Sequence, residues 1–240
     1  MGHLHSPGSD LESAEEAPDS PRVSGGRPVG RFRVASQQGG KSIAVSTWCV
    51  TTEDGATADA LSRLLGGIPQ LLESGDDHVL EVRTRCDRVR VLFLEGREAV
   101  SFRMVMRGAG RTLHVCDGNR FLEPIGARGS LCGCPVGLAD RKAAAQAGRG
   151  PMPEVSIGFR LADLPELGVF CLESSSWELT AALPAMAAAL DAAAEPVLGV
   201  LRCELVEFTT RFGIAVSYRR PVVEVGGDRM LAQNAVELAA

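Results

Sequence analysis

Aromatic residues, histidine, basic charge and long apolar runs are all scarce in this sequence. Aromatic residues make up 5% of the 240 residues and do not alternate with arginines, so a base-stacking platform for single-stranded nucleic acid is not expected. No window of about 18 residues is apolar throughout, which argues against a membrane-spanning helix. The net charge is -5 at pH 7, whereas a protein that coats DNA is usually basic.

Catalytic patterns are missing as well. The chain has four histidines, and neither a Ser/His/Asp nor a Cys/His arrangement is indicated around them. The Gly-Gly-Lys-Ser segment at 39–42 resembles the end of a phosphate-binding loop, but such a loop needs a glycine six positions before Lys41, and none is there. We therefore interpret this segment as a turn before a strand, and we expect no enzyme.

Composition divides the chain into three parts. Residues 1–28 are rich in Pro, Ser, Gly, Asp and Glu, and they predict a disordered acidic tail without a secretory signal, so we expect a cytoplasmic protein. Residues 29–225 predict a single globular domain that is long enough to bury a core. Residues 226–240 begin with two glycines and predict a C-terminal tail, which includes a short helix at most.

The alternation of apolar and polar residues predicts that most of this domain is β-sheet. Strands are expected at 43–51, 79–85, 88–94, 99–106, 111–115, 155–161, 168–173, 199–211 and 214–225. The last two form a long hairpin that turns at Phe212 and Gly213. Helices are expected at 57–65, 138–147 and 177–194, and Pro184 should split or kink the third. The pattern indicates an α+β fold: an antiparallel or mixed β-sheet with about three helices and a Cys-rich loop over 116–135.

Seven cysteines are scattered along the chain, and this odd number makes a poor disulfide framework. Four of them lie in apolar or alternating runs and are interpreted as buried free thiols: Cys49, Cys86, Cys171 and Cys203.

The other three cysteines, together with one histidine, predict a structural zinc site. The candidate ligands are His114, Cys116, Cys132 and Cys134. Thiolates and imidazole bind zinc tetrahedrally, and positions 114 and 116 of a strand face the same side. The alternatives are a loop with free thiols and a surface histidine, or a redox pair at Cys132 and Cys134. In each case we expect the cysteines to converge, because the loop has few apolar side chains to anchor it.

Arginines gather in two strips on the expected strands. Their side chains should point away from the apolar face, which indicates either a solvated sheet face or a strip that contacts phosphates or an acidic partner. The strips consist of Arg83, Arg85, Arg88 and Arg90, and of Arg211, Arg219 and Arg220.

Several stretches together resemble a known family. They are His-Val-Cys-Asp-Gly (114–118), Cys-Gly-Cys-Pro (132–135), Ala-Asp-Arg-Lys-Ala-Ala-Ala-Gln-Ala-Gly-Arg-Gly (139–150), Phe-Arg-Leu-Ala-Asp-Leu-Pro-Glu-Leu-Gly-Val-Phe (159–170), Ser-Ser-Trp-Glu-Leu (175–179), Val-Glu-Phe-Thr-Thr-Arg (206–211) and Val-Ser-Tyr-Arg-Arg-Pro-Val (216–222). Over about residues 30–225 the chain resembles the recombination directionality factors of actinophages and their relatives in actinobacterial chromosomes.

This resemblance implies a non-enzymatic accessory protein. Such a factor binds a large serine integrase already on attachment-site DNA, favours excision over integration, and makes little or no sequence-specific DNA contact of its own. The acidic net charge agrees with a protein partner. The alternative from another class is a zinc-stabilised DNA-binding regulator that uses the arginine strips.

The resemblance also bears on the metal. Cys116, Cys132 and Cys134 match the family's cysteines, but Pro151 stands where the family has a further cysteine after Gly-Arg-Gly. Because proline offers no ligand atom, His114 is our choice for the fourth ligand of zinc.

Overall fold

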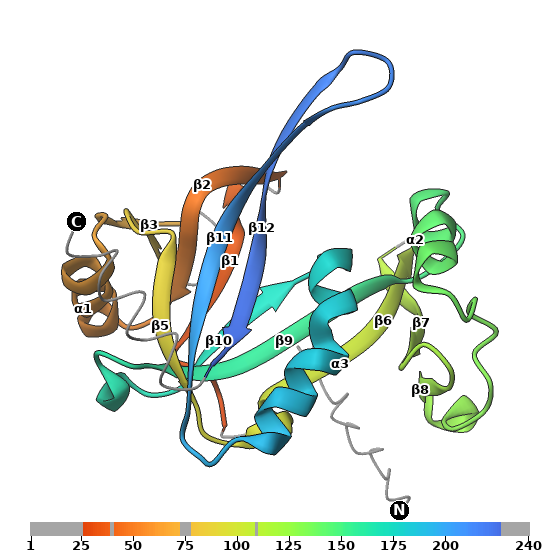
Figure 1. Ribbon diagram of the computed structural model, residues 1–240, viewed down its shortest axis with the longest axis horizontal. Coiled ribbons are helices and arrows are strands. Elements are labelled where there is room, and N and C mark those ends of the chain that lie inside the picture. Colours follow the sequence, from red (N-terminus) through yellow and green to blue (C-terminus); the bar gives the residue numbers. More distant parts are fainter. Residues whose placement is uncertain (1–25, 39–40, 73–77, 109, 227–240) are drawn as a thin grey trace, which may run out of the picture.

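A twisted, mixed β-sheet organises the chain in the computed structural model (Figure 1). The structure describes residues 26–38, 41–72, 78–108 and 110–226. The predicted tails at 1–28 and 226–240 lie almost wholly outside these residues, as do both glycines of the 39–42 segment.

Twelve strands, three α-helices and three short 3₁₀ turns make up the described part of the chain. The strands are β1 Gly30–Gln38, β2 Lys41–Thr52, β3 Pro69–Leu71, β4 Leu80–Arg83, β5 Arg88–Phe93, β6 Val100–Gly108, β7 Arg111–Cys116, β8 Phe121–Glu123, β9 Met152–Leu161, β10 Phe170–Ser174, β11 Val197–Thr209 and β12 Ala215–Val225. The helices are α1 Gly55–Leu65, α2 Leu138–Gln146 and α3 Trp177–Ala192, and the 3₁₀ turns are η1 Gly96–Ala99, η2 Ile125–Ala127 and η3 Pro165–Leu167.

The strand order shows how the two sides of the sheet are connected. The main path runs β12-β11-β5-β9-β10-β1-β2-β4-β3, and β6, β7 and β8 branch from β9. Successive parts of β9 pair with β6 and with β5, so this one strand connects the β7–β8 end to the β11–β12 hairpin. β1 and β10 are parallel, whereas the other described pairs are antiparallel. The predicted α+β class with a mixed sheet is thereby confirmed.

The few aromatic residues of the chain gather at the centre of the core. Phe32 of β1 is fully buried and makes edge-on ring contacts with three aromatic neighbours. The ring centroids lie 5.9 Å from Trp48, 5.3 Å from Phe159 and 5.8 Å from Phe170. Such contacts stabilise a core beyond the area that they bury. Through side-chain packing, Phe32 therefore connects β1 to its neighbours β2 and β10 and to β9 beyond β10.

Local signals set the helix boundaries. α1 begins after Asp54, whose carboxylate accepts a hydrogen bond of 2.8 Å from the Thr57 backbone N–H. It ends at Gly66 and Gly67, both with positive φ, as predicted. At Gly67 a Cβ atom would lie 2.1 Å from the Arg83 carbonyl oxygen, so only glycine fits this turn.

Of the two outcomes predicted at Pro184, a split or a kink, the split does not occur, because α3 continues through this residue as one element. Pro184 lies on the exposed side of the helix, so its ring displaces no buried side chain. Leu183 and Met186 on either side are buried, and their packing holds the helix together. None of the helices in the described part of the chain has the length and apolar content needed to cross a membrane.

Three of the four cysteines predicted to be buried thiols are buried and free, namely Cys49, Cys171 and Cys203. Cys86 is also free but only partly buried, which corrects the prediction. It lies in the turn between β4 and β5, where its thiol reaches the Leu65 carbonyl at 3.6 Å.

Ion pairs cross the face of the sheet opposite the aromatic core. Glu173 of β10 accepts hydrogen bonds from Arg31 and Arg33 of the neighbouring strand β1, and the Arg33 Nε–Glu173 Oε2 distance is 3.0 Å. Burial acts to raise the pKa of Glu173, but the charges and hydrogen bonds of both guanidinium groups outweigh it and hold the pKa below its usual value.

We expect Glu173→Gln to lower the free energy of unfolding by about 1–2 kcal/mol at pH 7. A depressed carboxyl pKa contributes stability that is fully present above the unfolded-state pKa of about 4.3 and is lost as the pH falls through the folded-state pKa. The gap between the wild type and the variant in urea denaturation should therefore shrink below about pH 4. Exposed Glu166→Gln is the control, and a gap independent of pH would contradict this account.

Candidate metal centre

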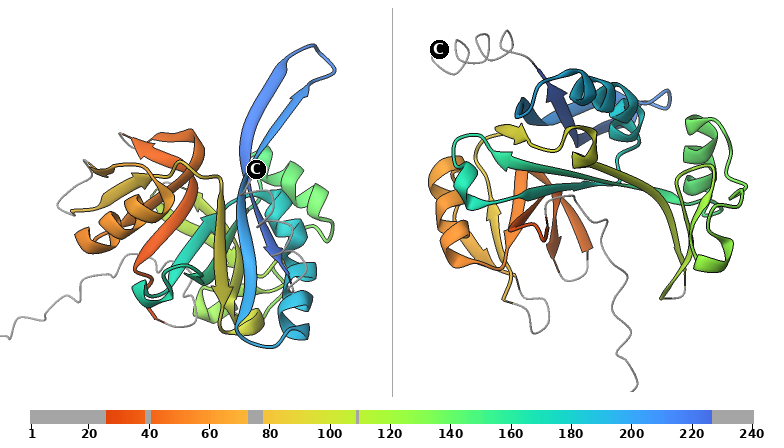
Figure 2. Two further views of the ribbon diagram at one scale, coloured as in Figure 1. Left: turned by 60° about the vertical axis from the view of Figure 1, so that its left-hand side comes forward. Right: turned by 90° about the horizontal axis from the view of Figure 1, so that it is seen from below.

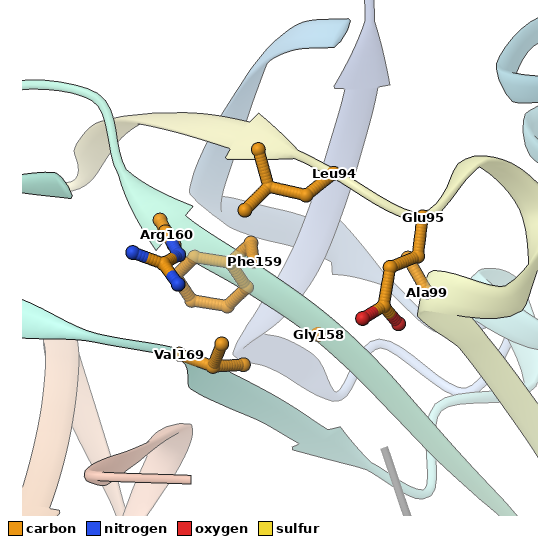
Figure 3. Close-up of a pocket in the computed structure, with 7 residues that line it drawn as sticks. All are labelled: Leu94, Glu95, Ala99, Gly158, Phe159, Arg160 and Val169. Atoms are coloured by element: carbon orange, nitrogen blue, oxygen red, sulfur yellow. The ribbon is translucent and has the colours of Figure 1, made fainter. Parts of the chain in front are cut away.

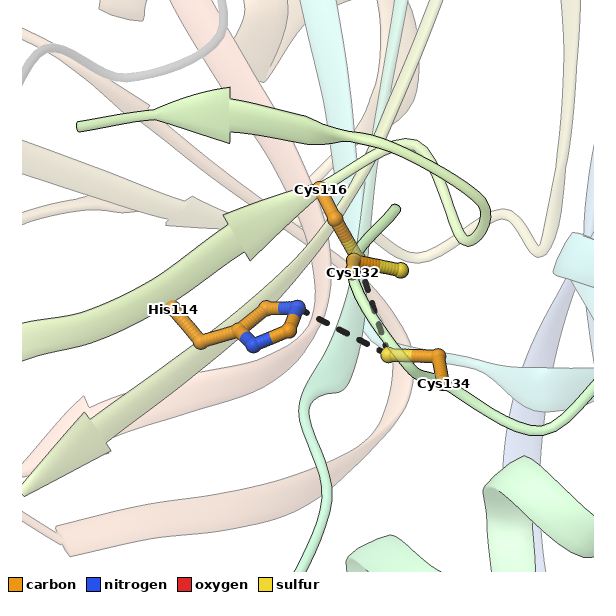
Figure 4. A group of neighbouring side chains, drawn as sticks. All are labelled: His114, Cys116, Cys132 and Cys134. Carbon is orange, nitrogen blue, oxygen red and sulfur yellow. Dashed lines mark hydrogen bonds between the residues drawn. The ribbon is translucent and has the colours of Figure 1, made fainter. Parts of the chain in front are cut away.

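Four side chains converge at the end of the molecule where β7, β8 and α2 meet (Figures 1 and 4). His114 and Cys116 are near the end of strand β7 and share one of its faces. Cys132 and Cys134 come from the loop that follows β8. One ligand atom from each residue can be chosen so that all four lie within 4.8 Å of one another. The predicted convergence of the cysteines is therefore observed, with His114 beside them.

The loop reaches this position by hydrogen-bonding back onto itself. The Asp117 carboxylate accepts bonds from the N–H groups of Asn119 (2.8 Å) and Arg120 (2.7 Å), which closes a tight turn. The Cys132 N–H then donates to the Asn119 carbonyl at 2.9 Å. Strand β8 and turn η2 lie between the Asp117 turn and Cys132. The segment expected as an irregular loop therefore contains regular structure of its own.

The separations within the cluster suit a tetrahedral metal. The Cys116 Sγ–Cys134 Sγ distance is 3.7 Å, and the Cys134 Sγ–His114 Nε2 distance is 3.6 Å. Bonds of about 2.3 Å to sulfur and about 2.0–2.1 Å to nitrogen at tetrahedral angles place two sulfurs about 3.8 Å apart and sulfur and nitrogen about 3.6 Å apart. Three thiols and one imidazole are also a donor set typical of structural zinc sites. The residues present therefore fit zinc.

The pKa shifts of Cys116, Cys134 and His114 do not indicate a reactive thiolate. Burial raises the pKa of the Cys116 thiol to about 12 and also raises the pKa of Cys134. Burial lowers the pKa of His114, so its ring is neutral at pH 7 and keeps a lone pair for a metal. A reactive thiol needs a depressed pKa, so the redox interpretation gains no support here. A bound divalent cation would supply the positive charge that deprotonates the thiols.

Neighbouring groups hold the cluster against the body of the protein. The Gly118 N–H points at Cys116 Sγ at 3.3 Å, as a donor to a metal-bound thiolate does. Arg141 of α2 donates to the Gly118 carbonyl at 2.8 Å, and a Cβ atom on Gly118 would lie 2.2 Å from this guanidinium group. Buried Met104 and Trp177 pack against Cys116 from the other side. Pro151 is buried, and it contributes no ligand.

The two arginine strips are engaged largely within the protein. Arg90 pairs with Asp163, Arg220 with Glu204, and Arg83 with the buried Glu81. Arg219 donates to the Cys203 carbonyl at 2.9 Å. Because these cations already have partners, the structure gives little support to a phosphate-contacting strip.

Two hollows in the described part of the chain differ greatly in size. One, lined by Glu95, Phe159, Arg160 and their neighbours, holds about 20 Å³, which is room for roughly one water molecule (Figure 3). The other lies beside the start of α1 and holds about 700 Å³. Its three arginines are in ion pairs, Arg27 with Glu53 and both Arg31 and Arg33 with Glu173.

Sequence reasoning did not single out the exposed apolar residues of the β11–β12 hairpin. Phe208, Phe212 and Ile214 are 50%, 75% and 60% exposed. The available signal was three large apolar residues next to a predicted turn, where polar residues are usual.

The protein combines a mixed sheet, a His/Cys cluster and a long β11–β12 hairpin. The model of one family, described as Gp3-like and recombination directionality factor-like, matches residues 29–225, and the chain belongs to that family. The family is regulatory rather than catalytic. Among solved structures, none matches the chain.

Proposed function

We propose that this protein binds a phage-type serine integrase on attachment-site DNA and switches it from integration to excision. The observation that carries the proposal is the family match, which spans the whole domain from residue 29 to 225. The acidic net charge and the internally paired arginines support a protein partner rather than direct sequence-specific DNA contact. With an integrase on DNA as its partner, the protein is expected to act in the cytoplasm.

The switch must work through differential affinity. A ligand shifts an equilibrium only when it binds one state better than another. A difference of about 3 kcal/mol between two integrase conformations changes the preference roughly 100-fold, which is enough to reverse a modest bias. The protein needs no catalytic group for this, because the integrase performs every strand exchange.

Within this function, Zn²⁺ held by His114, Cys116, Cys132 and Cys134 has a structural role. The four ligands come from β7 and from the returning loop, so the metal would fasten that loop to the sheet. Metal ligation would thus supply the cohesion that the exposed loop residues Ile125, Leu131 and Val136 do not.

In a reconstituted reaction, we expect the cognate integrase to recombine hybrid-site DNA only when this protein is added. The same addition should inhibit recombination between the two integration sites. An integrase that is active in integration but shows no stimulation on hybrid sites would contradict the proposal. A gel shift with attachment-site DNA alone tests the alternative, since a DNA-binding regulator would be retained without integrase and released steeply by salt.

A further inference from the structure

The β11–β12 hairpin extends well beyond the rest of the sheet (Figures 1 and 2). The register of β11 and β12 runs from Gly199 opposite Val225 to Thr209 opposite Ala215. β5 pairs with β11 only as far as Arg202, so the remainder of the hairpin has two strands and, in the described part of the chain, no third. We call residues 204–220 the distal hairpin. At about 3.3 Å per residue it reaches roughly 20 Å past the end of β5.

One face of the distal hairpin is apolar beyond the Glu204–Arg220 ion pair at its base, which closes at 2.6 Å. Residues that stand opposite each other in an antiparallel pair lie on the same face, and Val206 stands opposite Tyr218 as Phe208 does opposite Val216. Ile214 continues this row, since its carbonyl accepts from the Thr210 N–H. We call the set the apolar face of the distal hairpin: Val206, Phe208, Phe212, Ile214, Val216 and Tyr218, with Phe212 at the turn.

The opposite face is more polar. Glu207 stands opposite Ser217, Thr209 opposite Ala215, and Leu205 opposite Arg219, which donates a hydrogen bond to the Cys203 carbonyl. Within the described residues no carboxylate pairs with Arg211, whose guanidinium group lies 4.7 Å above the Phe212 ring. The tip therefore presents an aromatic ring and an unneutralised cation together, a combination common at the centres of protein interfaces.

This arrangement is costly without a partner. A two-stranded hairpin is only marginally stable in water, because a third strand or a helix is needed to bury its apolar side chains. Contiguous exposed apolar surface on a soluble protein marks an interaction site. DNA suits the apolar face poorly, because its phosphates would meet large apolar side chains there, and Arg220 at the base is already neutralised by Glu204. Two copies that met tip to tip would bring their Arg211 side chains together, whereas a partner with an acidic rim would neutralise Arg211.

We propose that the apolar face of the distal hairpin docks into an apolar groove of the partner protein whose rim carries a carboxylate opposite Arg211. The inference rests on the proposed function, so the partner is the serine integrase. Phe208, Phe212 and Ile214 fill the groove, and binding orders a hairpin that has little support of its own in the free protein.

Two matched triple variants test the docking surface. The first replaces Phe208, Phe212 and Ile214 by serine, and the second replaces Ile125, Leu131 and Val136, which are 82%, 76% and 92% exposed in the loop after β8. The dissociation constant of each labelled protein is measured on the cognate integrase bound to hybrid-site DNA. We expect the hairpin variant to bind about 100-fold more weakly and the loop variant to bind like the wild type. Arg211→Glu should also weaken binding, and Arg211→Lys should largely restore it.

Hydrogen exchange of the wild type gives a second measurement that does not depend on any variant. The backbone amides of the distal hairpin should exchange quickly in the free protein and at least tenfold more slowly in the complex. Unchanged exchange in the complex, or a hairpin variant that binds integrase normally, would overturn the docking surface and leave the proposed function intact. A wild type that does not bind integrase at all would overturn both. Hairpin-dependent self-association, or hairpin-dependent retention on DNA alone, would replace the integrase with that occupant and refute the proposal.

Discussion

Replacing Cys134 by serine should abolish metal binding and lower the free energy of unfolding by several kcal/mol, because the energy of metal ligation is also folding energy. Cys134 is the most informative ligand to replace, since its sulfur lies within 3.7 Å of both Cys116 Sγ and His114 Nε2. Elemental analysis of protein purified without chelator measures the metal, and urea denaturation measures the stability. Treating the wild type with a chelator should reproduce the stability of the variant.

Two further variants sharpen this test. Cys86→Ser changes a partly buried thiol outside the cluster, so it should keep the metal and lose less than about 1 kcal/mol. His114→Cys should keep the metal, because a four-cysteine site also binds zinc, whereas His114→Ala should weaken it strongly. Wild-type protein that contains no zinc, or a Cys134→Ser variant that retains it, would contradict the metal assignment.

Phe32→Ala should cost about 3–5 kcal/mol of unfolding free energy, the second large effect that we expect. Phe32 is fully buried and contacts the rings of Trp48, Phe159 and Phe170. Truncation removes three aromatic contacts at once and leaves a cavity between strands that cannot close without moving the sheet.

Chemical denaturation of the purified variants measures this cost. Phe212→Ala removes the same side chain at a site that is 75% exposed, so its effect on stability should stay within about 0.5 kcal/mol. A loss below about 1 kcal/mol for Phe32→Ala would mean that the aromatic cluster contributes little to the free energy of unfolding.

The period-two pattern predicted most strands, but it missed those whose partners are distant or whose length is short. β1 was not predicted, although Phe32 between Arg31 and Arg33 has the alternation of a half-buried strand. Its position depends on the parallel pairing with β10, which no local signal encodes. β3 and β8 have three residues each, too few to establish a period.

Burial on the polar face of the sheet was equally hidden from the sequence. Alternation places Glu81 on the face opposite Val82, where a charged residue is expected to meet water. Glu81 is 2% exposed and pairs with Arg83 at 2.9 Å. The burial is set by neighbouring strands that are brought together by the overall topology rather than by residues next to Glu81 in the chain.

The candidate metal centre could be predicted in composition but not in geometry. The spacing of His114 and Cys116 on a strand is a local property, so their shared face followed from the pattern alone. The return of Cys132 and Cys134 depends on the turn at Asp117 and on the Asn119–Cys132 hydrogen bond. The hairpin was predicted too, but its isolation was not, because the point where β5 stops pairing is a tertiary feature.

The parallel pairing of β1 with β10 sets the order of events during synthesis. Gly30 lies beside Phe170, so a strand near the centre of the sheet waits for a partner about 140 residues later in the chain. At about 5–20 residues per second the ribosome takes roughly 7–28 s to deliver that partner. During this interval the Phe32 side chain and the open edge of β1 are exposed on a nascent chain. The core of the protein therefore closes late, only after β10 has been made, and the exposed surface of the waiting segment makes it a target for chaperones during synthesis.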